Sequence, residues 1–207
     1  MPEGDEKART VRRLFDTISP RYDFVNRVMT LGMDVGWRRR TVRELALPAG
    51  SRILDLACGT GDLCRELRVA GHRPVGFDFS HGMLLAAKTD APLVEADILR
   101  LPVRDAGAEG ATCGFALRNV VSLQGLFAEL ARVVRPGGRI TVMTHIQSEL
   151  PAKRVELLKE LLPSARRIAV LADSSNTGQL ASAEAGARRL GVEIGRASCR
   201  ERVCSTV

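Results

Sequence analysis

The sequence predicts an α/β fold built on a doubly wound parallel sheet. Short apolar runs alternate with helical stretches between residues 52 and 144, as expected for parallel strands joined by helical crossovers. The first apolar run leads into a glycine turn that opens a helix, and ligands of doubly wound folds bind at such strand ends. The chain has 207 residues, 45% hydrophobic and 27% charged, which suits one such domain with a sizeable core.

The individual elements follow from the apolar runs and the turn residues between them. The expected strands cover residues 52–56, 74–79, 93–96, 111–117 and 139–144. The expected helices cover residues 62–70, 80–88 and 123–134, and the region 8–45 is predicted to form helices broken at Ser19-Pro20 and at Gly32. Ser80 is a suitable N-cap for the second of these helices, and residues 135–138 (Arg-Pro-Gly-Gly) are expected to turn into the fifth strand.

Three segments make up the expected organisation of the chain. Residues 1–50 form a helical cap on the substrate side, residues 51–145 a ligand-binding core of Rossmann-like type, and residues 146–207 an atypical α/β tail. Within the tail, residues 151–162 and 178–190 have helical patterns and residues 167–172 a strand pattern.

Composition argues against several classes of protein. No apolar run reaches the roughly 18 residues of a membrane span, and no apolar stretch follows the charged N-terminus, so a cytoplasmic location is expected. Five cysteines without a CxxC pair and three scattered histidines predict neither a disulfide framework nor a metal site. The net charge is +7, with a cluster at Arg38–Arg40 that is either a solvated helix face or a surface for anionic lipid. No nucleic-acid-binding signature accompanies the cluster.

The strongest functional signal is the segment ILDLACGTGDL, residues 53–63. Gly59 and Gly61 allow the backbone to come close to a ligand, because a side chain there would collide with it. A nicotinamide dinucleotide site needs a small residue where Cys64 stands, and the carboxylate of Asp55 would repel a pyrophosphate. The same carboxylate would attract the sulfonium and amino groups of S-adenosylmethionine. The segment therefore predicts that cofactor.

Two later aspartates stand at the ends of the next two strands. We expect Asp78 to accept hydrogen bonds from both ribose hydroxyls, with capping of the following helix as the alternative. We expect Asp97 to take the adenine amino group while Ile98 packs on the purine, with a simple turn aspartate as the alternative. The candidate cofactor-binding residues are Asp55, Ala57, Gly59, Thr60, Gly61, Asp78, Phe79, Asp97, Ile98 and Tyr22.

Two further segments narrow the prediction. RYDFVNRVMTLGMDVGWRRR (residues 21–40) and GFALRNV (residues 114–120), taken with the glycine motif and the RVVRPGGRI turn, resemble signature stretches of the menaquinone and ubiquinone C-methyltransferase family. The resemblance covers about residues 11–143 and implies a class I methyltransferase fold. One departure is Asp34, where histidine is expected before the tryptophan.

The resemblance implies a reaction in which a ring carbon of a demethylated prenyl-quinol takes the methyl group of S-adenosylmethionine. Arg118 and Asn119 are the candidate catalytic residues, and the guanidinium of Arg118 could hold the phenolate oxygen but not act as a base at neutral pH. A structural ion pair is the alternative for Arg118, and Tyr22 and Asp23 are candidates for a lid over the donor. A prenylated substrate also implies peripheral contact of the N-terminal helices with a membrane. The choice between menaquinone and ubiquinone precursors, the prenyl length and the oligomeric state stay open.

The tail departs from this family. Residues 146–192 resemble part of an ABC transporter substrate-binding protein, and residues 193–204 resemble a translated sequencing adapter; a divergent C-terminal half is the alternative. The family sheet has two further strands, so we expect this sheet to be incomplete at its C-terminal edge. The competing functions are a methyltransferase acting on another small molecule, a ligand-binding module without catalysis, and a nucleic-acid methyltransferase.

Overall fold

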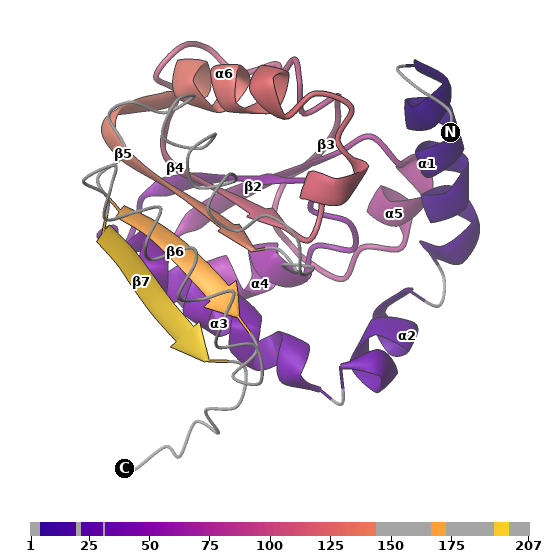
Figure 1. Cartoon of the computed structure of the whole chain (residues 1–207), viewed down its shortest axis with the longest axis horizontal. Helices are drawn as coiled ribbons and strands as arrows, with labels where there is room; N and C mark the ends of the chain where they lie inside the picture. The colour runs from indigo at the N-terminus through magenta and orange to yellow at the C-terminus, as the bar shows by residue number, and fades with distance from the viewer. Residues whose placement is uncertain (1–4, 20–21, 31, 144–166, 173–192, 199–207) are drawn as a thin grey trace.

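A five-stranded parallel sheet forms the centre of the computed structural model, which describes residues 5–19, 22–30, 32–143, 167–172 and 193–198 (Figure 1). Its strands are β1 (Arg52–Leu56), β2 (Arg73–Asp78), β3 (Leu93–Glu95), β4 (Ala108–Gly114) and β5 (Val134–Met143). They lie in the order β3-β2-β1-β4-β5. The chain therefore changes direction across the sheet between β1 and β4, which is where doubly wound folds hold ligands.

Helices cover both faces of this sheet, as the sequence predicts. They are α1 (Asp5–Ile18), α2 (Tyr22–Met29), α3 (Met33–Leu45), α4 (Asp62–Val69), α5 (His81–Leu85) and α6 (Leu123–Val133). The breaks between the first three fall at the expected places. On one face, Leu54, Leu56 and Phe77 pack with Leu126 and Phe127 of α6. On the other face, Ile53 packs with Val42 and Leu45 of α3 and with Leu63 and Leu67 of α4.

Two strands, β4 and β5, differ from the prediction by more than one residue. β4 covers 108–114 instead of 111–117, because Phe115 takes a left-handed conformation (φ +57°) that ends the strand. The expected turn at 135–138 lies inside β5 as an irregularity, since Ala108 pairs with Val134 but Gly110 pairs with Arg139. Helix α5 also ends at Leu85, three residues earlier than expected.

The tail contributes two described strands. The strands β6 (Arg167–Ala172) and β7 (Glu193–Ser198) pair with each other in parallel as a separate two-stranded sheet. β6 matches the strand expected at 167–172, whereas the helices expected at 151–162 and 178–190 lie outside the described residues. Within the described part of the chain, β5 is an edge of the main sheet, as expected from the missing strands. No helix among the described residues is long and apolar enough to cross a membrane.

Candidate active site

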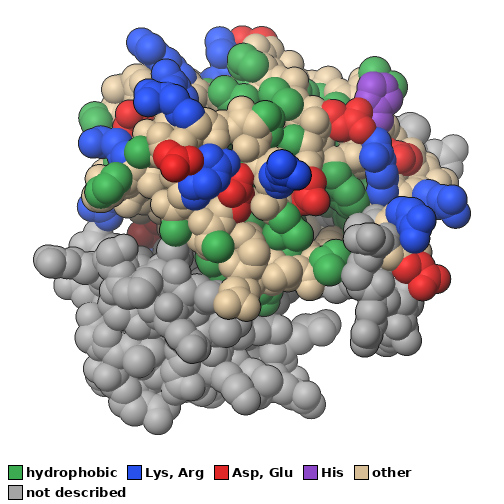
Figure 2. Space-filling model, turned by 90° about the horizontal axis from the view of Figure 1, so that it is seen from above, with side chains coloured by type: hydrophobic (Ala, Val, Ile, Leu, Met, Phe, Trp, Pro, Cys, Tyr) green, Lys and Arg blue, Asp and Glu red, His purple; other side chains and the backbone are tan. Residues whose placement is uncertain are grey.

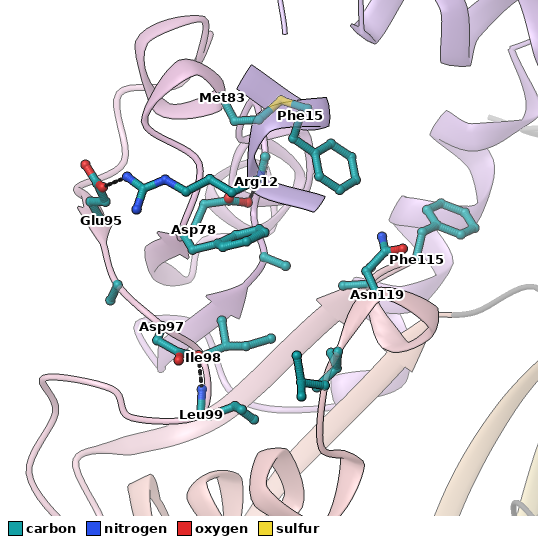
Figure 3. A pocket seen from close by; sticks show the side chains of 18 of the residues that line it. Arg12, Phe15, Asp78, Met83, Glu95, Asp97, Ile98, Leu99, Phe115 and Asn119 are labelled. Carbon is teal, nitrogen blue, oxygen red and sulfur yellow. Dashed lines mark hydrogen bonds and ion pairs between the residues drawn. The ribbon is translucent and has the colours of Figure 1, made fainter. Parts of the chain in front are cut away.

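A cavity of about 410 Å³ opens at the carboxyl ends of β1 to β4 (Figure 3). Its size is in the range of small-molecule sites, and its position is the one expected for a doubly wound sheet. It is lined by Arg9, Arg12, Phe15, Tyr22, Ala57, Gly59, Asp78, Phe79, Met83, Glu95, Ala96, Asp97, Ile98, Leu99, Gly114, Phe115, Ala116, Asn119, Val120 and Val121.

The two glycines of the turn after β1 have different structural roles. Gly59 lines the cavity with φ +56°, and a Cβ added there would meet no protein atom within 4 Å. Gly61 lies outside the cavity lining with φ +80°, and its added Cβ would lie 2.5 Å from Cγ2 of Thr89. Gly59 therefore leaves open space against its backbone on the cavity side, whereas packing against Thr89 accounts for Gly61.

Asp78, the last residue of β2, links the glycine turn to α5. Its carboxylate accepts hydrogen bonds from the backbone N–H groups of Gly59 at 2.8 Å and Ser80 at 2.9 Å. Burial raises the pKa of Asp78, while backbone hydrogen bonds from Ser80, Gly59 and Phe79 act in the opposite direction. Ser80 caps α5 through its own hydroxyl, as expected, by accepting from Met83 N at 3.2 Å. A carboxylate has about four lone-pair positions, so Asp78 keeps acceptor capacity towards the cavity.

The loop after β3 forms the next part of the wall. Asp97, Ile98 and Leu99 all line the cavity, and Asp97 Oδ1 accepts a hydrogen bond from Leu99 N at 2.9 Å. Figure 3 shows Asp97 and Ile98 beyond the end of β3, on the same side of the cavity as Asp78. Phe79 also lines the cavity. These residues form an apolar slot with two carboxylates at its edge, which suits a flat, polar-edged ring system.

Asp55 does not line the cavity, contrary to the expectation that its carboxylate faces the donor. It points to the α4 side of β1, is 1% exposed, and accepts from Thr112 Oγ1 at 2.7 Å and Cys64 Sγ at 3.3 Å. Burial raises the pKa of Asp55 to about 7, an effect that outweighs the hydrogen bonds from Thr112 and Cys64. Asp55 thus braces β1, β4 and α4 beneath the glycine turn.

We expect the Asp55→Asn variant to lose a pH dependence of stability that the parent chain has. The neutral Asp55 carboxyl stabilises the fold below its ordinary pKa of 3.8, and this stabilisation is lost as the pH rises through about 7. The amide of the variant has no proton to lose. The melting temperature of the variant relative to the parent should therefore be higher at about pH 8 than at about pH 5. An equal difference in melting temperature between variant and parent at both pH values would contradict a raised pKa for Asp55.

Three aromatic side chains outside the wall formed by Asp78 and Asp97 also line the cavity, Phe15, Tyr22 and Phe115. Tyr22 and Phe15 meet edge to face with ring centroids 6.0 Å apart, and Phe115 meets Trp37 in the same way at 6.1 Å. Ala57 and Phe115, at the ends of the adjacent strands β1 and β4, both have left-handed backbones at φ +51° and +57°. Such strain in residues other than glycine is concentrated at ligand-binding sites.

The two candidate catalytic residues follow β4 in a 3-10 turn, Leu117–Asn119. Asn119 lines the cavity, and Figure 3 shows its amide close to Phe115. The backbone of Arg118 belongs to the same turn, but its side chain lies outside the described part of the structure. Thr60, another candidate, is buried behind the turn and does not line the cavity.

Helix α1 closes the cavity on a side that the sequence did not predict. Arg12 forms an ion pair with Glu95 at the end of β3, and Asp16 Oδ1 accepts from Ser80 Oγ at 2.6 Å and Gly82 N at 3.0 Å. The hydrogen bond from Ser80 lowers the pKa of Asp16. Helix α1 thereby brings Arg9, Arg12 and Phe15 into the cavity wall. These contacts of α1 join residues far apart in sequence, so no local sequence pattern predicts them.

We expect the Gly82→Ala variant to detach α1 while leaving the core folded. An added Cβ would lie 3.0 Å from Cα and 3.2 Å from the carbonyl oxygen of Asp16, both backbone atoms that cannot rotate away. Ligand affinity should fall about tenfold, or 1.4 kcal/mol, with faster proteolysis within α1. Gly36→Ala is the matched control, because its added Cβ meets nothing within 4 Å. Equal proteolysis of the two variants would refute this role of Gly82.

Comparison with known proteins assigns the chain to a family. Residues 3–180 match the profile of the ubiE/COQ5 methyltransferase family, a wider range than the motifs at 11–143 carry. The demethylmenaquinone methyltransferase of Corynebacterium kroppenstedtii is 40% identical over 168 residues, which are 79% of this chain and 73% of that protein. The protein of the same name from Mycobacterium sp. (strain KMS) is 44% identical over 139 residues, 67% of this chain and 60% of that protein. The chain thus spans 60% to 73% of these two relatives.

Solved structures support the same fold. A complex between the Haloferax volcanii Trm112 methyltransferase activator and a putative methyltransferase matches with a TM-score of 0.59 and 20% identity, over 71% of this chain and 75% of the matched chain. A putative methyltransferase from an antibiotic biosynthesis pathway of Anabaena variabilis matches with a TM-score of 0.53 and 22% identity, over 60% and 61%. These likenesses show the Rossmann-like fold expected from the sequence. The chain therefore belongs to the ubiE/COQ5 family of S-adenosylmethionine-dependent methyltransferases.

Proposed function

We propose that this chain methylates a ring carbon of demethylmenaquinol, with S-adenosylmethionine as methyl donor. The observation that carries the proposal is the two-sided cavity, with Asp78 and Asp97 on one side and Phe115 and Asn119 on the other (Figure 3). One side suits a nucleoside and the other an aromatic ring with oxygen substituents. The names of the relatives favour the menaquinone precursor over the ubiquinone precursor.

The residues present suit the cofactor. The open space above Gly59, where no protein atom lies within 4 Å of an added Cβ, leaves room for a ligand against the backbone. Asp78 would hold the ribose hydroxyls, and Asp97 and Ile98 would hold the adenine, because these side chains line the cavity from adjacent strand ends. S-adenosylmethionine supplies an electrophilic methyl group on its sulfonium.

The chain's own contribution is orientation and exclusion of water. The aromatic wall would hold the quinol ring flat, and apolar Val120 and Val121 extend that wall. The amide of Asn119 would donate to a quinol oxygen, which favours the electron-rich phenolate form. Arg118, the preceding residue of the same turn, is the candidate for holding the phenolate oxygen, and its guanidinium would not act as a base at neutral pH.

We also propose that α1 and α2 rest on a lipid surface. Leu14 and Ile18 of α1 are 57% and 37% exposed, and Phe24 and Val28 of α2 are 71% and 55% exposed. Each pair is four residues apart, so each helix presents one apolar face beside the cavity. Phe24→Ser should lower co-sedimentation with anionic vesicles several-fold, whereas Val69→Ser, at a position 85% exposed on α4, should not. Equal binding of both variants would argue against the proposal.

Methyl transfer tests the main proposal directly. The full chain would be incubated with S-adenosylmethionine and a short-chain demethylmenaquinol, in parallel with a demethylated ubiquinone precursor. We expect mass spectrometry to detect a gain of one methylene unit in the naphthoquinol alone. Methylation of the benzoquinol precursor instead would show that the proposed substrate is wrong and that the ubiquinone precursor is the acceptor. Methylation of neither compound, with cofactor binding intact, would remove quinols from the proposal.

A further inference from the structure

One hydrogen-bonded cluster joins the glycine turn to the N-terminal helices. Thr60, between the two glycines of the turn, is 3% exposed, and its Oγ1 donates to Asp23 Oδ1 in α2. The other carboxylate oxygen of Asp23 lies 3.3 Å from Lys88 Nζ, and Lys88 N donates back to Thr60 O at 3.1 Å. Asp23 is therefore held by two residues outside its own helix, Thr60 in the turn and Lys88, which is itself hydrogen-bonded to the turn.

This cluster continues into the cofactor side of the cavity. Asp78 Oδ2 accepts from Gly59 N at 2.8 Å, and Gly59 is covalently joined to Thr60. The contacts run from Asp78 through the turn to Asp23, and the neighbour of Asp23 is Tyr22, which lines the cavity. Asp78, which would hold the ribose, and Tyr22, which lines the cavity from α2, are thus joined by one continuous set of contacts.

Helix α2 has few other attachments among the residues that the structure describes. Phe24 and Val28 are exposed, and the ion pair of Arg27 with Asp34 is long at 3.8 Å. Tyr22 packs edge to face on Phe15 of α1. Asp23 is therefore the described side chain that ties α2 to the glycine turn.

We propose that Asp23 is a positioning residue that couples cofactor binding to the acceptor side of the cavity through Thr60. Occupation of the space above Gly59 restricts the glycine turn, and a restricted turn holds Asp23 and α2 more firmly. Tyr22 is then fixed over the site only when the donor is bound. Coupling of this kind is reciprocal. If the bound donor makes α2 more firmly attached, then a variant in which α2 is loosened also binds the donor more weakly. The inference rests on the proposed cofactor but does not depend on which quinol is methylated.

Hydrogen exchange of the full chain, with and without saturating S-adenosylmethionine, tests this coupling. In the parent chain the cofactor should slow exchange both at the glycine turn (59–61) and across α2 (22–29). Thr60→Val, which keeps the shape but removes the hydroxyl, should retain protection at the turn and lose most of it in α2. Asp23→Asn removes the charge but leaves an oxygen that can still accept from Thr60 Oγ1, so it should lose only part of the protection in α2. Thr60→Ser should restore protection in α2, because it restores the hydroxyl.

The control is Asp90→Asn. Asp90 is an exposed carboxylate whose pair with Arg68, at 2.9 Å, lies away from the cavity. Cofactor protection of α2 should be the same in this variant as in the parent chain. A second readout is the cofactor affinity of the Asp23→Asn, Thr60→Val double variant, which should match that of Thr60→Val alone, because Asp23 acts through the Thr60 hydroxyl.

The outcomes separate this inference from the proposed function. Protection of α2 that is equal in the parent chain, Asp23→Asn and Thr60→Val would overturn the coupling and leave cofactor binding intact. Protection at the turn without protection of α2 in the parent chain would also overturn it. No protection anywhere at saturating cofactor would overturn both the coupling and the proposed function.

Discussion

The Asp78→Ala variant should bind S-adenosylmethionine at least about 100-fold more weakly than the parent chain, a loss of roughly 2.7 kcal/mol. Asp78 is the buried carboxylate that lines the cavity and fixes the glycine turn through Gly59 N. Removing it deletes two charge-assisted bonds to a ribose, each worth about 1.5–3 kcal/mol, and leaves two backbone N–H groups without their acceptor. Titration calorimetry measures the affinity.

Thermal melting gives an independent measure of the same loss. At about one hundred times its dissociation constant, a ligand adds about 2.7 kcal/mol to the stability of the folded chain, which is roughly 5–10 °C for a domain of this size. The parent chain should show this rise and Asp78→Ala should not. Asp97→Asn is the graded control, because Asp97 is exposed and its loss should cost about tenfold, or 1.4 kcal/mol. An Asp78→Ala variant with parental affinity would remove Asp78 from the site.

One side of the cavity could be predicted from the sequence, because each of its residues stands at or just after the end of a recognisable strand. Gly59, Asp78 and Asp97 each follow an apolar strand, and parallel strands bring their carboxyl ends to one edge of the sheet. Their neighbours Ala57, Phe79 and Ile98 line the cavity for the same reason. This part of the site therefore depends only on recognising the strands.

Asp55 was misplaced although a usable signal existed. Side chains alternate between the two faces of a strand, so Asp55 lies on the same face as Ile53, which packs under α3 and α4. The prediction used the charge of Asp55 and not its face. Helix α1 is a different case, since its contacts through Arg12 and Asp16 join residues that are more than 60 positions apart in sequence.

The arginine cluster, Arg38–Arg40, was only partly predicted. Arg39 is 64% exposed, as expected for a solvated helix face, but Arg38 is only 8% exposed, and all three arginines have acidic partners. Basic and acidic side chains are likewise interspersed on the face shown in Figure 2. Asp34, the departure from the family pattern, is one partner of Arg38 and also accepts from Thr30 Oγ1 at 3.0 Å. A run of arginines in sequence therefore does not by itself predict a positively charged surface. Carboxylates one helical turn away, or on a neighbouring helix, can pair with the arginines.

Replacement of Arg38 by Met should be the most destabilising change in the N-terminal half of the chain. One guanidinium nitrogen of Arg38 pairs with Asp34 and the other lies 2.8 Å from Asp62 Oδ2, at the start of α4. Asp34 and Asp62 are 2% and 7% exposed, so without Arg38 two buried carboxylates lose their shared partner. Breaking a buried pair costs about 3–5 kcal/mol, and we expect the lower end, about 3 kcal/mol, because Asp62 keeps Arg65 and Asp34 keeps Thr30 and Arg27 as partners. A fall in melting temperature of roughly 6–12 °C is the expected result for a domain of this size.

Arg39→Met provides the matched control on the same helix. The side chain of Arg39 is 64% exposed and its ion pair with Glu66, at 3.2 Å, is open to solvent, so its loss should cost no more than about 1 kcal/mol. The two variants remove the same charge from adjacent positions, and only burial separates them. If both variants lowered the melting temperature equally, the net positive charge of α3, and not the burial of Arg38, would account for the effect. A large effect of Arg38→Met alone would mean that the buried guanidinium of Arg38 adds substantially to the apolar packing that holds α3 on the glycine-turn helix α4.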